Sequence, residues 1–308
     1  MRFASEKCQS KVRLDGKVVL VTGCNTGLGK ETAKDFYRRG AKVLMACRDK
    51  ERTEEAMADI KTTCKGLNGL GILIFIHLDL NALNSVRNCA NKVLESETRL
   101  DILVNNAGQA GKKGVTVDGF DKNYGINYLG HFLFTMLLLP VLMKSRAARI
   151  VNVSSVMHYI SNIELEDLNF RNRWYTVSAS YGQSKLALVM FTRELADRLK
   201  KRGIHNVRVY SLQPGFVKTD IGRNLNTVFF GMRWIWNHVL GLFFKSVEAG
   251  SQTIIYCSLD EKCAQDSGLY YSDCKIITSS RKSRNEELCK KLWEKSSQMV
   301  GFSSSFTI

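Results

Sequence analysis

The sequence predicts an α/β fold, a Rossmann-type doubly wound parallel β-sheet with helices on both faces, in a single domain. Two observations lead to this expectation. Short apolar runs rich in Val, Ile and Leu alternate with helical segments along most of the 308 residues, which is typical of parallel strands joined by crossover helices. A glycine-rich turn also follows the first apolar run directly and leads into the first helical segment.

The expected elements follow from the spacing of apolar residues. The strands are predicted at residues 17–22, 42–47, 71–77, 100–104, 149–153 and 206–212. Helices are predicted at residues 27–39, 52–63, 83–97, 120–143 and 180–202, with a last amphipathic helix at 286–296. No Ser/Gly linker divides the chain, so we expect one domain over residues 15–300, an N-terminal extension at 1–14 and a flexible tail at 301–308.

Composition restricts the class of protein and its compartment. The nine cysteines include no Cys-x-x-Cys pair, so we expect reduced thiols and no metal site. The first fifteen residues contain no apolar run that could serve as a signal peptide or an anchor. These features predict a cytoplasmic protein, or one on the cytosolic face of an intracellular membrane.

The chain is strongly basic. It has 45 Lys and Arg residues against 29 Asp and Glu, a formal net charge of +16. This charge favours anionic partners such as phosphorylated cofactors or acidic lipid headgroups, although a solvated basic face is the alternative. No nucleic-acid partner is expected, because the sequence has no recognisable binding motif or aromatic stacking platform.

The glycine-rich turn is the first candidate site. It reads TGCNTGLG over residues 22–29, and its candidate cofactor contacts are Gly23, Asn25, Thr26, Gly27, Leu28 and Gly29. Glycines permit a tight turn and a close approach of the backbone to a pyrophosphate at the start of a helix.

The end of the second strand bears on the choice of cofactor. Arg48 is placed to bind a 2′-phosphate, whereas Asp49 either accepts a hydrogen bond from a free ribose or caps the next helix. NADP(H) is therefore favoured, with NAD(H) as the alternative.

Three residues are candidates for acid–base chemistry. Tyr181 and Lys185 have the i,i+4 spacing that places them on one face of the expected helix, where an ammonium group can stabilise a phenolate. On spacing alone, an ordinary helix with a half-exposed Tyr and Lys would be the better explanation. Ser155 closes the fifth strand at the edge where open α/β sheets bind ligands, and Ser154 is the alternative on the opposite side.

Taken together, these motifs resemble the short-chain dehydrogenase/reductase family between about residue 11 and about residue 275. Gly23-x-x-x-Gly27-x-Gly29 is similar to the cofactor signature of that family. The resemblance implies that Ser155 binds the substrate oxygen, that Tyr181 and Lys185 are catalytic, and that Asn127 holds a water in the relay leading from the lysine. It also implies cofactor contacts from Asp79, Leu80, Asn106, Ala107, Gly108, Tyr181, Lys185, Pro214, Gly215, Val217 and Thr219.

Residues 46–49, 152–155, 248–252 and 267–274 are similar to the retinol dehydrogenase-like branch and to WW-domain oxidoreductase relatives. This likeness implies a lipophilic alcohol and its aldehyde or ketone as substrates, with retinol and retinal first. The alternative function is a catalytically weak cofactor-binding protein that interacts with partners through its basic surface.

Two apolar segments leave alternatives open. Residues 222–245 correspond to the substrate lid of the family, and they either contact a membrane surface through Trp234 and Trp236 or form ordinary core helices. Residues 129–143 are apolar on all sides and must be buried, either between the protein's own sheet and a second subunit of a homodimer or under insertions of the same chain.

Overall fold

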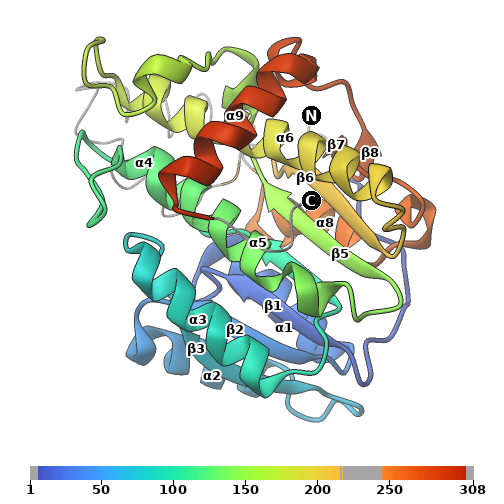
Figure 1. Cartoon of the computed structure of the whole chain (residues 1–308). Helices are drawn as coiled ribbons and strands as arrows, with labels where there is room; N and C mark the ends of the chain where they lie inside the picture. The colour runs from blue at the N-terminus through green and yellow to red at the C-terminus, as the bar shows by residue number, and fades with distance from the viewer. Residues whose placement is uncertain (1–5, 216, 218–244, 303–308) are drawn as a thin grey trace.

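An eight-stranded sheet forms the centre of the computed structural model, which describes residues 6–215, 217 and 245–302 (Figure 1). The strand order is β3-β2-β1-β4-β5-β6-β7-β8, and every neighbouring pair is parallel except β7 with β8. The strands are β1 (Val18–Thr22), β2 (Lys42–Cys47), β3 (Ile72–His77), β4 (Ile102–Asn105), β5 (Ala148–Val153), β6 (Val207–Gln213), β7 (Leu269–Ser272) and β8 (Lys275–Ile276). The expected Rossmann-type architecture is confirmed.

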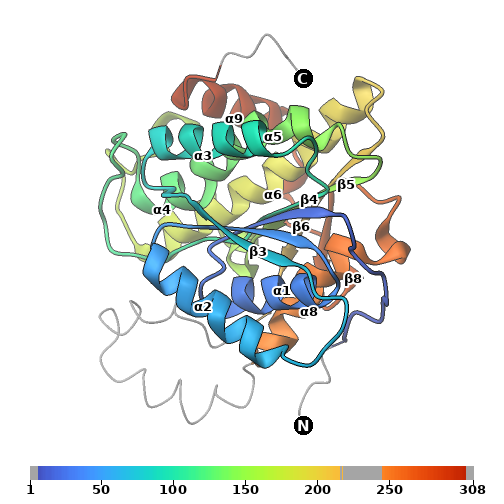
Figure 2. The same cartoon turned by 90° about the horizontal axis from the view of Figure 1, so that it is seen from below.

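Helices cover both faces of this sheet, as Figure 2 shows. One layer consists of α1 (Gly27–Arg38), α2 (Lys50–Thr63) and α8 (Val247–Leu259). The opposite layer contains α3 (Leu83–Ser96), α5 (Gly130–Leu142), α6 (Val177–Lys201) and α9 (Glu286–Met299). Shorter helical pieces are α4 (Lys122–Tyr124), the π-helical η1 (Gly125–Leu129), and the 3₁₀ turns η2 (Val156–Tyr159), η3 (Leu165–Asp167), η6 (Glu261–Cys263) and η7 (Lys282–Arg284).

The expected elements lie within a few residues of those observed, whereas β7, β8 and α8 extend the expected set. β7 has four residues and β8 has two, which is too short for a periodicity to identify. The helix expected at 120–143 begins at Lys122, because the carboxylate of Asp121 accepts a hydrogen bond from the Tyr124 amide and caps it.

The apolar helix is covered by the chain itself. Lys122–Leu142 is a 21-residue helix, long and apolar enough to cross a membrane. The most apolar window within this helix has a mean hydropathy of 1.5, yet 83% of that window is buried inside the fold. Trp293 of α9 packs 5.2 Å from the ring of Phe132, and Ser296 Oγ lies 2.8 Å from the hydroxyl of Tyr128. Of the two coverings expected from the sequence, the described residues supply the intramolecular one.

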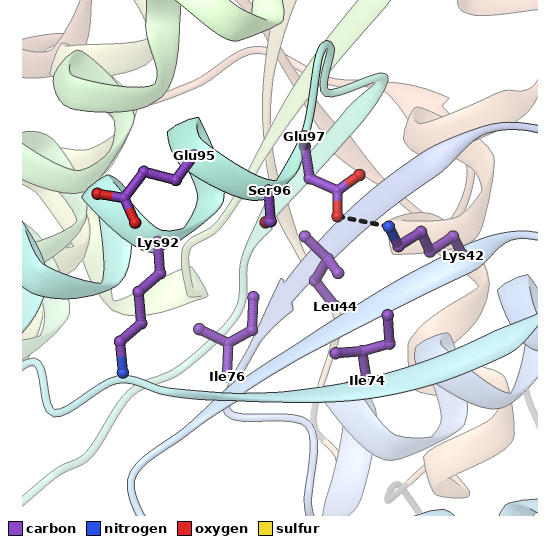
Figure 3. A pocket seen from close by; sticks show the side chains of 8 residues that line it. All are labelled: Lys42, Leu44, Ile74, Ile76, Lys92, Glu95, Ser96 and Glu97. Atoms are coloured by element: carbon purple, nitrogen blue, oxygen red, sulfur yellow. Dashed lines mark ion pairs between the residues drawn. The ribbon is translucent and has the colours of Figure 1, made fainter.

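A groove at the edge of the sheet lies between the end of α3 and the strands β2 and β3 (Figure 3). Leu44, Ile74 and Ile76 contribute apolar side chains, and an ion pair of 2.6 Å joins Lys42 to Glu97. None of the candidate site residues lines this groove. The candidate site instead gathers where β1, β4, β5 and β6 end.

Candidate active site

The glycine-rich turn joins β1 to α1. Gly23 has a φ of +62° and Gly27 a φ of +55°, in the left-handed region that favours glycine. A Cβ atom added at Gly23 would lie 2.8 Å from the Cβ of Ala107, so this turn sits directly against the turn that follows β4. Among the described residues, α1 has no side-chain cap and no acidic residue in its first turn. Its first amide groups are therefore suited to an anionic group such as a pyrophosphate.

Hydrogen bonds fix these two turns to each other. Thr22 Oγ1 accepts from the amide of Asn106 at 3.0 Å and from that of Ala107 at 2.9 Å. The Asn106 side chain donates to the carbonyl of Thr22 at 2.9 Å and to that of Gly23 at 3.1 Å. Asn106 and Ala107 therefore hold the first residues of the glycine-rich turn in place.

A buried histidine extends this network towards Asn127, and the sequence analysis did not identify it. His131 Nδ1 lies 2.9 Å from the carbonyl oxygen of Asn127, so this nitrogen carries the proton. Its Nε2 is then the acceptor for the Thr22 hydroxyl, 3.0 Å away. Burial lowers the pKa of His131 to about 4, so the ring is neutral at neutral pH. Its i+4 position relative to Asn127 is the one signal in the sequence that could have suggested this contact.

Arg48 and Asp49 follow β2, at the same end of the sheet. The Asp49 carboxylate accepts a hydrogen bond of 3.0 Å from the amide of Arg52 and caps α2. Of the two roles open to this residue, helix capping is the one observed. Arg48 is exposed to solvent. Asp79, after β3, similarly binds the amide of Asn81 at 3.0 Å.

Tyr181 and Lys185 lie one turn apart near the start of α6, whose N-cap Thr176 accepts from the amide of Ala179 at 3.0 Å. Lys185 Nζ is 5.7 Å from the centroid of the Tyr181 ring and donates to the carbonyl of Val153 at 2.8 Å. Burial lowers the pKa of this lysine to about 8. The helix and the end of β5 together hold the ammonium group in place.

Ser155 and Ser154 have different environments. Ser154 is buried and donates to the carbonyl of Lys185 at 2.8 Å, which is a structural contact. Burial raises the pKa of the Tyr181 phenol, and the hydroxyl of Ser155 has a smaller effect that lowers it. Ser155 is therefore the serine that shares a site with Tyr181.

His158 holds the backbone of Ser155, and the sequence analysis did not single it out. The amide of His158 lies 3.1 Å and its Nδ1 2.8 Å from the carbonyl of Ser155. Its Nε2 accepts from the amide of Ser280 at 3.2 Å, so the proton is on Nδ1. No sequence motif marks it, since its partner Ser280 is distant along the chain.

Asn127 lies in the π-helical segment η1, a feature that is frequent at functional sites. Its amide group donates to the carbonyl of Gln109 and to Ser184 Oγ, both at 2.9 Å, and its Oδ1 accepts from the Gln109 amide at 2.8 Å. A Cβ added at Gly108 would lie 3.4 Å from this Oδ1 and 3.3 Å from Lys185 Nζ. Asn127 and Lys185 therefore flank the same glycine.

The remaining candidate contacts lie in two further places. The side chains of Val217 and Leu28 both lie against Gly250 of α8, where an added Cβ would be 2.5 and 2.8 Å from them, so the segment after β6 and the start of α1 both pack on α8. Leu80 packs against Gly130 at the start of α5. Pro214 and Gly215 are half-buried, next to Val217. Thr219, Trp234 and Trp236 lie outside the described residues.

In the part of the chain that the structure describes, no group of three or more His, Cys, Asp or Glu residues could hold a metal ion. The candidate residues bring a phenol, an ammonium group, a hydroxyl and an amide to one end of the sheet, beside a turn suited to an anionic group.

Comparison with known proteins is consistent with this arrangement. The model of the short chain dehydrogenase family matches residues 17–228. Retinol dehydrogenase 12 of mouse (Mus musculus) is 41% identical over 97% of this chain and 91% of its own length. Human (Homo sapiens) retinol dehydrogenase 13 is 40% identical over 96% of this chain and 87% of its own length. A solved structure of an uncharacterised protein from Mycobacterium paratuberculosis is 31% identical, with a TM-score of 0.75 over 95% of this chain and 96% of that chain.

Proposed function

Because the chain belongs to the short-chain dehydrogenase/reductase family, in its retinol dehydrogenase-like branch, and is an oxidoreductase of alcohols and carbonyls, we propose that it uses NADP(H) and Tyr181 to interconvert a lipophilic alcohol and its aldehyde or ketone. The observation that carries this proposal is the buried ammonium group of Lys185, which lies 5.7 Å from the centroid of the Tyr181 ring and is bound to Val153 at the end of β5, two residues before Ser155.

Cofactor binding is assigned to the ends of β1, β2 and β4. The first turn of α1 offers amide groups for the pyrophosphate, and glycines 23, 27 and 29 leave three positions of the turn and helix start without a side chain. Arg48 supports a preference for NADP(H), since an exposed guanidinium can bind a 2′-phosphate and Asp49 is engaged in capping α2. When bound, the nicotinamide supplies or accepts the hydride.

The protein's own residues move the proton. During reduction, the hydroxyl of Tyr181 donates its proton to the substrate oxygen, which Ser155 holds by a hydrogen bond. Burial raises the pKa of Tyr181, so the phenol keeps this proton at neutral pH, as a general acid must. After proton transfer, the ammonium group of Lys185 stabilises the phenolate, and Asn127 orders the path along which the proton is replaced.

The substrate class rests on the relatives. Proteins about 40% identical over nearly the whole chain are named retinol dehydrogenases, which supports retinal and retinol as the first substrates to try. Steroid and lipid-derived carbonyls come next.

The proposal is tested by following the oxidation of NADPH and NADH with retinal, a short aliphatic aldehyde and a steroid ketone. We expect turnover of retinal with a kcat/KM at least about tenfold higher for NADPH than for NADH, since one charge-assisted contact contributes about that factor. Equal use of both cofactors would contradict the assigned preference. Binding of NADPH without turnover of any carbonyl would instead favour the non-catalytic interaction protein.

A further inference from the structure

Two cysteines lie side by side beneath the glycine-rich turn. Cys24 belongs to this turn and Cys47 is the last residue of β2, and their sulfur atoms are 3.7 Å apart. The parallel pairing of β1 with β2 brings them together, since Thr22 is in register with Ala46 and the amide of Gly23 donates to the carbonyl of Ala46 at 2.9 Å. Both are free thiols.

The two sulfurs have different chemical environments. Cys47 Sγ accepts a hydrogen bond of 3.2 Å from the amide of Cys24, whose own thiol lies 3.1 Å from the carbonyl of Val21 and donates to it. The neighbouring Cys24 side chain is the main cause that lowers the pKa of Cys47 to about 7. Burial raises the pKa of Cys24. Cys47 is therefore the better nucleophile, and Cys24 is placed to attack it in turn.

We propose that Cys24 and Cys47 form a reversible disulfide that weakens cofactor binding at the adjacent turn. The effect on binding rests on the proposed function, whereas the disulfide itself does not. Cys47 directly precedes Arg48, and Cys24 lies within the turn that is proposed to receive the pyrophosphate. A modification of these thiols would therefore act at the proposed cofactor site.

The oxidant is a peroxide, because Cys24 is fully buried and Cys47 is only 3% exposed, which favours a small reagent. The Cys47 thiolate attacks one oxygen of hydrogen peroxide, the O–O bond breaks, and a sulfenic acid and a hydroxide form; the hydroxide takes up the proton that Cys47 lost on ionisation and becomes the first water. Cys24 then attacks the sulfur of this sulfenic acid, the S–S bond forms, and the hydroxyl leaves as a second water with the Cys24 proton. Two thiols lose two electrons in total, and one peroxide is reduced to two waters.

Closing the bond must move the turn. An S–S bond of about 2.05 Å requires the sulfurs to approach well within their present separation. β2 is paired on both sides, with β1 and with β3, where Cys47 is in register with His77. Cys24 lies in the loop beyond the β1 ladder. The turn is therefore the part that shifts, and the amide of Cys24 loses its thiolate acceptor.

The experiment uses the reduced full chain, treated with hydrogen peroxide, alkylated and digested with trypsin without reductant. Cleavage after Lys17, Lys30, Lys42 and Arg48 places the two cysteines in separate peptides, 18–30 and 43–48, each with a single cysteine. We expect these peptides joined, lighter by two hydrogen atoms than their sum, and released by dithiothreitol. We also expect NADPH to bind about tenfold more weakly after oxidation, as followed by cofactor fluorescence, with recovery on reduction.

Controls separate the possible outcomes. Cys24→Ser and Cys47→Ser should each abolish the joined peptide and make the affinity for NADPH insensitive to peroxide, whereas Cys89→Ala, at a buried cysteine of α3, should behave like the unchanged protein. Recovery of both peptides in alkylated form would overturn the disulfide. A joined peptide with unchanged NADPH affinity would overturn its effect on binding. If the reduced protein binds neither NADPH nor NADH, the proposed function fails, and the joined peptide still decides whether the disulfide forms.

Discussion

The Nζ atom of Lys185 lies 5.7 Å from the centroid of the Tyr181 ring, one turn along the same face of α6. The i,i+4 spacing explains this proximity, and the hydrogen bond from Nζ to Val153 ties it to the end of β5. Burial acts on the two groups in opposite directions, raising the pKa of the phenol and lowering that of the ammonium group to about 8. Both shifts favour the neutral forms of the side chains.

Tyr181→Phe removes the proton donor and leaves the ring in place. Because general acid catalysis contributes about 10²- to 10⁴-fold, kcat for carbonyl reduction should fall by at least about 100-fold. The dissociation constant for NADPH should change little, since the turn after β1 is untouched. Steady-state kinetics and cofactor fluorescence measure the two effects. Retention of most of the activity would refute the role of the phenol.

The pH profile of reduction should follow Lys185. Its ammonium form is present below a pKa of about 8 and is lost above it, while Tyr181, whose pKa is raised, keeps its proton over that range. We expect kcat/KM for reduction to decline above about pH 8. Lys185→Arg should move this limb to higher pH, because a guanidinium stays charged. A limb at the same pH in both proteins would assign the titration to another group.

Gly108→Ala tests the packing around the proton path. The added Cβ would stand 3.3 Å from Lys185 Nζ and 3.4 Å from Asn127 Oδ1, so one of these polar groups must shift. We predict about tenfold lower kcat, with little change in melting temperature, because small misplacements in an active site are costly. Gly111→Ala is the matched control, since its Cβ meets nothing closer than 3.6 Å. Equal losses in both variants would show that the loop, and not the proton path, is responsible.

The sequence was sufficient for strands β1 to β6 and for the placement of Tyr181 and Lys185 on one helix face, because both depend on local patterns. The run at 42–47 coincides with β2, and the spacing of Tyr181 and Lys185 alone places them on one face. By contrast, the spacing of Tyr181 and Lys185 does not report that the pKa of Tyr181 is raised. The sign depends on burial by the whole fold, which no local pattern reports.

Other features could not be read from the sequence because they depend on one extra residue or on distant partners. The π-helical turn around Asn127 hardly alters the apolar periodicity of the surrounding helix. The bond between His158 and Ser280, and the contact of Cys24 with Cys47, arise only when separate strands and loops are brought together.

Arg48→Ala tests the cofactor preference. Loss of a guanidinium facing a 2′-phosphate should weaken NADPH binding by about tenfold or more and leave NADH binding nearly unchanged. Lys61→Ala, near the end of α2, removes one exposed positive charge away from the turn and serves as the control. Titrations of both cofactors at fixed ionic strength give the ratio. Parallel weakening for NADPH and NADH would mean that Arg48 does not distinguish them.

Trp293→Ala tests whether α9 is part of the core. The indole stacks 5.7 Å from the ring of Phe191, meets Phe132 edge-on at 5.2 Å, and lies 4.5 Å from the guanidinium of Arg198. Truncating it leaves a cavity over α5 and α6, which should lower the free energy of unfolding by about 3–5 kcal/mol.

Trp174→Ala is the control for this prediction. Trp174 is 88% exposed, and its truncation should change stability by no more than about 0.5 kcal/mol. Urea unfolding of the two variants compares them directly. A loss below about 1 kcal/mol at Trp293 would mean that α9 only rests on the fold. A loss in the predicted range means that α9 is needed to bury the apolar helix whose π-helical start carries Asn127.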